Sequence, residues 1–244
     1  MIREVAAFRL GLFGPAASNA VPTLINLLKE PTSYNGDKGR VIQALGFIGA
    51  PAQHAVPFLV DSLSDSNQWI QMTAAYSLLQ IGTVPVTAIP ALKRNLSDPG
   101  HIAALMAVAL LAAEQSPEAH SRVESMLTSR GDGNTQAHVA AALTFVKDVP
   151  DNLKAILRRM LQDEDASVPQ GAAIGLAKPH ADNLDQIIQV LVEGLKQGQF
   201  QIRCAQALGK IGPEAASAGP KLEQAKGYVL GIAAREAQAK VSKP

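Results

Sequence analysis

One pattern recurs along the whole chain: a leucine followed twelve residues later by a proline, as in the segment ALGFIGAPAQHAVP. The pair occurs at Leu10 and Pro22, Leu45 and Pro57, Leu78 and Pro90, and Leu208 and Pro220. Degenerate copies fill the intervals, so that the key leucine position is occupied by Leu10, Leu45, Leu78, Leu110, Leu143, Ile174 and Leu208, at spacings of 31 to 35 residues. A period in this range is typical of solenoids, in which each repeat buries its apolar face on its neighbours.

Each repeat is expected to form two antiparallel helices. The apolar residues of segments 57–65 and 68–81 follow helical spacing and not the alternation of a strand. Pro57 suits a first helical turn and Gly49 suits a helix end. Gly46 lies within a helix, at a cost of about 1 kcal/mol relative to alanine, and so predicts close approach of a neighbouring helix. The sequence therefore predicts an all-α fold, an α-solenoid of about seven stacked helix pairs.

The repeat pattern also predicts the domain organisation. Residues 1–244 are expected to form a single solenoid, with a half repeat or N-terminal cap at 1–14, six repeats over 15–212 and a C-terminal capping repeat at 213–244. Because 1–14 reads as the second helix of a pair, we expect either a capping arrangement or a fragment of a longer array.

The motif LG-x-x-G, followed by A-x-x-A-V-P-x-L-x-x-x-L-x-D, resembles the HEAT repeat, and most closely the short subtype named after phycobilisome (PBS) bilin lyases. The resemblance covers the whole chain and is clearest over 1–98 and 200–222. It implies that the second helices of the pairs line a concave surface. It also implies an adaptor, since most such proteins are adaptors with scattered enzymes among them.

The chain departs from the family in one respect. The arginine that the family carries seven residues before the key leucine is present only as Arg3. The equivalent positions hold Lys38, Gln71, Ala103, Gln136, Ser167 and Gln201. We therefore expect no continuous ladder of aspartate–arginine pairs, and we expect Asp65, Asp98 and Asp163 to cap the second helix of their pairs.

Charge and composition exclude several classes of protein. There are 22 Lys and Arg residues against 21 Asp and Glu, a net charge of +1, which argues against a dominant nucleic-acid surface. The single cysteine, Cys204, excludes an internal disulfide and is expected in the core; it agrees with a reducing compartment, so a cytoplasmic location is expected. No apolar run is long enough to predict a membrane span, and the N-terminus lacks the architecture of a signal peptide.

No catalytic constellation is found, so we expect no enzyme activity, no cofactor and no bound metal. The five histidines lack partners at metal-ligand spacing, and there is no His-Glu dipeptide of the kind that the di-iron deoxyhypusine hydroxylases of the HEAT class use. The acidic cluster 163–165 and the segment 131–134 are interpreted as turns and helix starts.

The expected function is that of a non-catalytic HEAT-repeat scaffold that binds a protein or peptide on its concave face. The expected partner-binding residues are the early, outward positions of the second helices: Lys38, Arg40, Gln68, Trp69, Gln71, His101, Gln136, His138, Gln170, Gln199, Phe200 and Arg203. Trp69 and Phe200 are candidate anchors, with Tyr34 as a third; the alternative is that their rings fill gaps in the solenoid. Two other functions stay open: a bilin-lyase-like subunit that handles a tetrapyrrole and its acceptor protein, and, more distantly, a nucleic-acid-binding solenoid.

Overall fold

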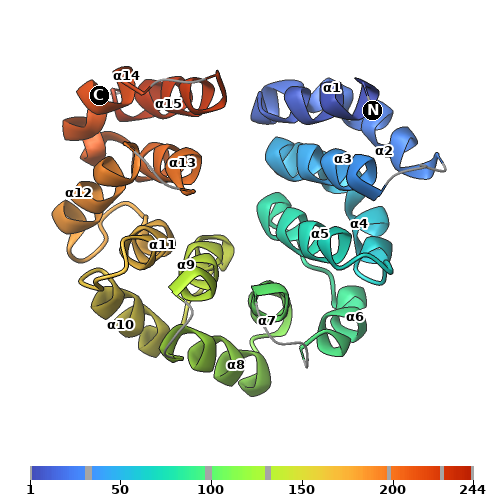
Figure 1. Cartoon of the computed structure of the whole chain (residues 1–244), viewed down its shortest axis with the longest axis horizontal. Coiled ribbons are helices and arrows are strands. Elements are labelled where there is room, and N and C mark those ends of the chain that lie inside the picture. Colours follow the sequence, from blue (N-terminus) through green and yellow to red (C-terminus); the bar gives the residue numbers. More distant parts are fainter. Residues whose placement is uncertain are drawn as a thin grey trace. The chain divides into compact units, whose positions relative to one another are not determined.

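The structure, a computed structural model, describes residues 2–30, 35–96, 101–129, 133–196, 199–225 and 228–242. These residues form helices joined by short turns, and none of them lies in a strand (Figure 1). The predicted all-α fold is confirmed. The chain divides into two compact units, Met1–Val123 (unit 1) and Glu124–Pro244 (unit 2); that one solenoid runs through both stays a prediction.

Each repeat contributes a first helix, here called A, and a second helix, called B. The A helices are α2 (Val21–Lys29), α4 (Val56–Ser62), α6 (Ile89–Arg94), α8 (Pro117–Thr128), α10 (Asp151–Met160), α12 (Leu184–Gly194) and α14 (Gly219–Glu223). The B helices are α3 (Asn35–Ile48), α5 (Gln68–Ile81), α7 (His101–Glu114), α9 (Gly133–Ala142), α11 (Ser167–Leu176), α13 (Gln201–Ile211) and α15 (Tyr228–Val241), and α1 (Ile2–Gly11) occupies a B position ahead of the first A helix.

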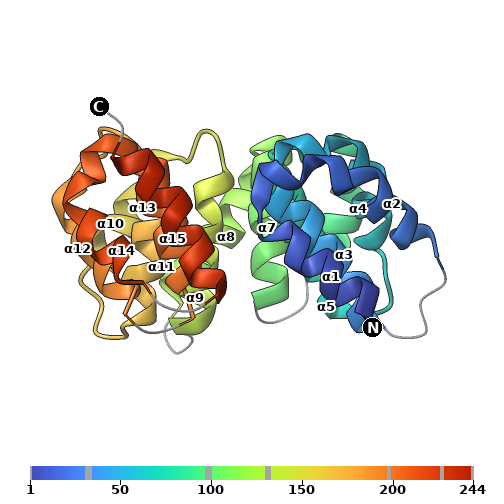
Figure 2. The same ribbon diagram turned by 90° about the horizontal axis from the view of Figure 1, so that it is seen from above.

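The B helices form a layer of their own in each unit. In unit 1, α1, α3, α5 and α7 pack side by side, and in unit 2 the same is true of α9, α11, α13 and α15 (Figures 1 and 2). The A helices α2, α4 and α6 of unit 1, and α10, α12 and α14 of unit 2, pack against the B helix of their own repeat. This is the antiparallel pairing that the repeat predicts.

The turn from a B helix to the next A helix follows from glycine and proline. Gly49 has φ of 74°, in the left-handed region, and ends α3. A 3₁₀ helix, η2 (Ala50–Ala55), follows, and Pro57 is the second residue of α4, as predicted. The equivalent 3₁₀ segments are η1 (Gly14–Ala20), η3 (Val86–Ala88) and η5 (Gly212–Ala218); η4 (Leu143–Phe145) instead continues α9.

The key leucine position forms the core of each repeat. Leu45, Leu78, Leu110, Leu143 and Leu208 are 0% exposed, and Ile174 is 3% exposed. Full burial of such a side chain stabilises the fold by about 1.5–3 kcal/mol relative to leaving it in water. Leu10, at the equivalent position of α1, is the exception at 43% exposed.

Glycines bring the B helices close together. At Gly46 a Cβ would lie 2.5 Å from Oε1 of Gln80 and 2.6 Å from Oγ of Ser77, both on α5, which confirms the predicted close approach. The hydroxyl of Ser77 donates a hydrogen bond of 3.0 Å to the backbone oxygen of Ile42, so a polar contact also joins α3 to α5. The other glycines directly after the key position behave in the same way: Gly11, Gly175 and Gly209.

Candidate functional site

The predicted partner-binding residues lie near the N-terminal ends of B helices, in two separate groups. Unit 1 carries Lys38, Arg40, Gln68, Trp69 and Gln71, and unit 2 carries Gln136, His138, Gln170, Gln199, Phe200 and Arg203. The side chain of His101 and the whole of Tyr34 lie outside the described residues, so their roles stay predictions. We call the first group the α3–α5 edge.

Trp69 is fixed by its neighbour across the helix interface. A Cβ at Gly39 would lie 1.7 Å from Cζ3 of the indole, so the ring rests directly on the backbone of α3. The backbone N–H of Trp69 donates to Oδ1 of Asn67 at 2.9 Å, which is the N-cap bond of α5. Trp69 is partly exposed, with the exposed Gln68 beside it in the chain. One region of the indole covers Gly39 and so fills a gap between α3 and α5, while the rest of the ring stays exposed. The structure thus combines both roles that the sequence allowed for Trp69.

An ion pair joins the same two helices. Nζ of Lys38 on α3 lies 2.6 Å from Oδ2 of Asp65 in the turn before α5. Burial raises the pKa of Asp65, but the hydrogen bonds from Lys38 and from the backbone N–H of Asn67, together with the charge of Lys38, outweigh it and hold the pKa below its ordinary value. In this repeat a lysine takes the place of the family's arginine.

The expected capping role of the aspartates is wrong in two repeats. Asn67, and not Asp65, caps α5; Asp65 accepts from the N–H of Asn67 and so shapes the turn. In the same way Asp163 accepts from the backbone N–H of Asp165, which in turn accepts from Ser167 at the start of α11. Asp65 lies two residues before the N-cap of α5, and Asp163 lies three residues before that of α11, so neither side chain caps its helix. Asp98 lies outside the described residues.

The glutamines seven residues before the key leucine do not present their amide groups freely to a groove. Nε2 of Gln71 donates to the backbone oxygen of Asp65 at 2.6 Å, and Nε2 of Gln201 donates to that of Leu195 at 3.0 Å. Gln136 reaches two backbone oxygens, those of Leu127 and Ser129, at 3.0 and 2.8 Å. Helix C-termini leave such carbonyls without intrahelical partners, so these amides complete the preceding A helix or the turn after it.

Phe200 is 1% exposed, so the expectation of an exposed anchor there is wrong. Its ring centroid lies 5.1 Å from that of His138 on α9, and Cζ of Arg203 lies 5.6 Å from its centroid. The aromatic ring therefore fills the space between α9 and α13, which is the alternative stated for it. His138 and Arg203 cover this ring, and both are only partly exposed.

Two hydrogen-bonded bridges connect α9 with α13 across the intervening repeat. Nε2 of Gln199 donates to Oδ1 of Asn134 at 2.7 Å, just ahead of α13. At the other end of that helix, Nζ of Lys210 donates to the backbone oxygen and to Oγ1 of Thr144 at 2.7 and 2.9 Å. Gln199 is thus engaged within unit 2, and Gln170 on α11 packs beside Gly194.

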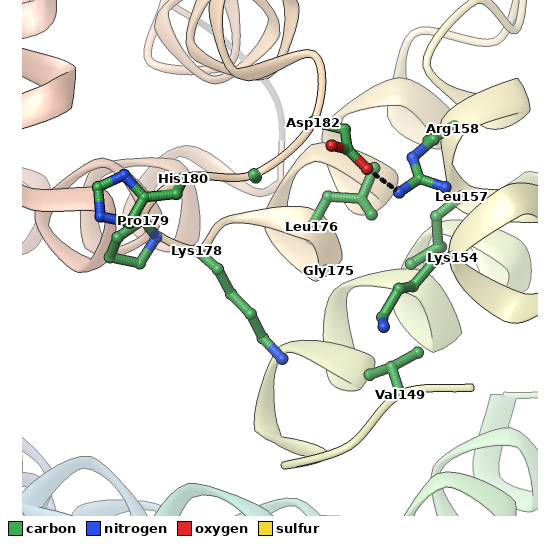
Figure 3. Close-up of a pocket in the computed structure, with 11 residues that line it drawn as sticks. Val149, Lys154, Leu157, Arg158, Gly175, Leu176, Lys178, Pro179, His180 and Asp182 are labelled. Carbon is green, nitrogen blue, oxygen red and sulfur yellow. Dashed lines mark hydrogen bonds and ion pairs between the residues drawn. The ribbon is translucent and has the colours of Figure 1, made fainter. Parts of the chain in front are cut away.

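A pocket of about 230 Å³ in unit 2 was not predicted from the sequence (Figure 3). It lies between α10, the end of α11 and the loop to α12, and its charged or ionisable lining residues are Lys154, Arg158, Lys178, His180 and Asp182. Lys154 and Arg158 are four residues apart on α10 and so share a face. That spacing can be recognised in the sequence, but the approach of Lys178, from the loop after α11, cannot.

The described residues hold no group of three or more His, Cys, Asp or Glu side chains that could bind a metal ion. Over the same ranges, no helix has the length and apolar character needed to cross a bilayer. Cys204 is buried at 0% exposed and has a free thiol, which confirms its predicted place in the core.

Comparison with known proteins identifies the class. Residues 21–112 match a family model of HEAT repeats, so this segment consists of HEAT repeats. The PBS lyase-like subtype stays a prediction.

Two of the solved structures that match the chain cover most of its length. A crystal structure of an engineered protein is 21% identical, covers 91% of this chain and 96% of its own, and has a TM-score of 0.39. Human deoxyhypusine hydroxylase in complex with glycerol is 20% identical, covers 99% of this chain and 97% of its own, and has a TM-score of 0.44. No curated protein matches the chain.

Proposed function

We propose that the chain is a non-catalytic HEAT-repeat scaffold that binds a protein or peptide at the α3–α5 edge. The observation that carries this proposal is the partly exposed indole of Trp69, which is held against Gly39. A fixed aromatic ring loses little conformational freedom on binding, and tryptophan is enriched among the residues that dominate interface energies.

The surroundings of Trp69 suit a polar rim. Gln68 is exposed, Arg40 is partly exposed, and the Lys38–Asp65 ion pair holds the turn beside the ring. Amide and guanidinium groups around a central aromatic side chain match the usual anatomy of an interface. None of these residues forms a pair of nucleophile and base, and for that reason the proposed role is binding and not catalysis.

The proposed binding surface is smaller than the one predicted from the sequence, because it leaves out the residues of unit 2. In unit 2 the polar side chains Gln136, Gln199 and His138 already make contacts within the protein, so their loss would disturb the fold before it disturbed a partner. The bilin-lyase-like and nucleic-acid-binding alternatives gain no observation of their own, and they stay predictions together with the cytoplasmic location.

The experiment is an affinity capture from native lysate with the wild-type chain and two variants as baits. Trp69→Ala removes the ring, and Gly39→Ala keeps it but displaces it, because the new methyl group would occupy the space of the indole. Gly231→Ala on α15 is the matched control, since a Cβ there meets nothing within 4 Å. Thermal melts establish that each bait is folded.

The proposal expects a protein that wild type and Gly231→Ala retain and that both Trp69→Ala and Gly39→Ala lose. A partner that all four baits retain equally would place the interface elsewhere and overturn the assignment of the α3–α5 edge. If the retained species were a coloured small molecule, the bilin alternative would replace the scaffold.

A further inference from the structure

The pocket in unit 2 collects cationic side chains over an apolar floor. Lys154 and Lys178 both line the pocket, and their side chains extend toward the same space from opposite sides (Figure 3). The apolar part of the lining consists mainly of Val149, Leu157, Gly175, Leu176 and Pro179. Such a combination of a largely apolar cavity with a few convergent polar groups is typical of small-ligand sites.

The acidic partners of these cations compensate them only in part. Asp151, which pairs with Lys154 at 2.8 Å, is 96% exposed, and so exposed a pair contributes little. Asp182 is the acidic residue of the lining and pairs with Arg158. Lys178 donates to the backbone oxygen of Lys147 at 3.3 Å, a neutral acceptor that does not cancel its charge.

Lys178 also acts on a third lysine, Lys210 on α13. Burial, and after it the charge of Lys178, lowers the pKa of Lys210 to about 8. The ammonium group of Lys210 donates to the backbone oxygen and to Oγ1 of Thr144, which are both neutral acceptors. The charges of Lys178 and Lys210 therefore repel each other, and an anion bound beside Lys178 would relieve this repulsion.

We propose that this pocket binds a phosphate monoester, with the phosphate group between Lys154 and Lys178 and the carbon chain on the apolar floor. A phosphate monoester carries about two negative charges on one head group and offers several acceptor oxygens, so it can satisfy two converging ammonium groups at once. A dicarboxylate distributes its two charges over separate groups, and that fits one convergence point less well. The pocket volume of about 230 Å³ suits a small metabolite.

The test is a titration of the full chain with inorganic phosphate and with glycerol 3-phosphate, at constant ionic strength, followed by NMR and calorimetry. Both probes are expected to bind with saturation, and glycerol 3-phosphate more tightly because its carbon chain contacts the floor. Lys154→Met and Lys178→Met keep the aliphatic stems and are each expected to weaken binding at least about tenfold, the effect of losing one charge-assisted hydrogen bond.

Two further variants make the test specific. Lys221→Met on α14 removes an exposed charge outside the pocket and is expected to leave binding unchanged. Asp182→Asn removes the carboxylate of the lining and releases Arg158, so it is expected to tighten binding several-fold. Absence of saturable binding at millimolar phosphate would overturn the proposal. Equal weakening by Lys178→Met and Lys221→Met would do so too, because binding would then follow net charge alone.

Discussion

At the scale of single residues, an amide takes the place of the family's guanidinium in three repeats. Gln71, Gln136 and Gln201 each donate to a backbone carbonyl ahead of their own helix. A neutral amide cannot form an ion pair with a carboxylate, but it can donate to a buried or half-buried carbonyl without the cost of burying a charge. The position seven residues before the key leucine therefore keeps its structural role while its chemistry changes.

At Lys38 a cation remains seven residues before the key leucine, and its ion pair with Asp65 should stabilise the fold in a pH-dependent way. The pKa of Asp65 is lower in the folded chain than the value of about 3.9 in an unfolded chain. Its carboxylate therefore stabilises the fold above that value, and the contribution is lost as the pH falls through the folded pKa. Asp65→Asn is expected to lower the free energy of unfolding by about 1 kcal/mol at neutral pH.

Urea unfolding at several pH values measures this. The difference between Asp65→Asn and wild type should shrink as the pH drops below about 4. Asp61→Asn, a change at an exposed carboxylate of the same unit, is the control. A difference that stayed constant down to acid pH would show that Asp65 acts through its shape in the turn and not through its charge.

The thiol of Cys204 is expected to be inert in the native protein. Burial raises its pKa to about 12, and only the thiolate reacts with disulfide reagents. At pH 8 a thiol-reactive chromogenic disulfide should modify the chain rapidly in denaturant and hardly at all without it. Rapid modification under native conditions would mean that the contact of α13 with its neighbours opens frequently.

At the scale of helices, much of the architecture could be predicted from the sequence, because the features that determine it lie close together in the chain. The helix pairs follow from apolar periodicity, and Pro57 and Gly49 mark a start and an end through their own backbone preferences. Even Gly46 predicted a close helix contact correctly.

The candidate sites were much less predictable, because they depend on partners far away in the sequence. Gln199 meets Asn134 across 65 residues, and Lys178 joins Lys154 only through the packing of α10 on α11. Phe200 was expected to be an exposed anchor because its place near a helix start resembles that of Trp69. The sequence pattern could not show that Phe200 is buried between α9 and α13, whereas Trp69 is covered by α3 on one region only and stays partly exposed.

The key leucine position also predicts how much a leucine-to-alanine substitution should destabilise the fold in different helices. Leu45→Ala empties a fully buried site and is expected to cost about 2–5 kcal/mol. Leu10→Ala changes the equivalent residue of α1, which is 43% exposed, and is expected to cost less than about 1 kcal/mol. Chemical denaturation of both variants measures the contrast. Equal costs would mean that α1 is covered in solution.

At the scale of the whole molecule, a destabilising substitution in one compact unit should shift the unfolding transition of that unit more than that of the other. The single tryptophan, Trp69, lies in unit 1, so its fluorescence reports that unit alone, whereas far-UV circular dichroism reports helices of both. In repeat proteins, stability is approximately a sum of repeat and nearest-neighbour contributions. Leu45→Ala should therefore shift the fluorescence midpoint in urea more than the dichroism midpoint.

The reciprocal variant completes this test. Leu208→Ala lies in unit 2 and is also fully buried, so it should shift the dichroism transition and leave the fluorescence midpoint of Trp69 close to that of wild type. Identical shifts of both signals by both variants would show that the two units unfold as one cooperative body.

The bridges from α9 to α13 have a mechanical consequence. A repeat array is elastic because each repeat contacts only its nearest neighbours and can rotate slightly against them. Gln199 with Asn134, and Lys210 with Thr144, connect a repeat to the next but one. Pulling or flexing this part of unit 2 would have to break both bridges before the repeats could separate, so we expect it to be a stiff segment under tension, where ordinary neighbouring pairs would yield gradually.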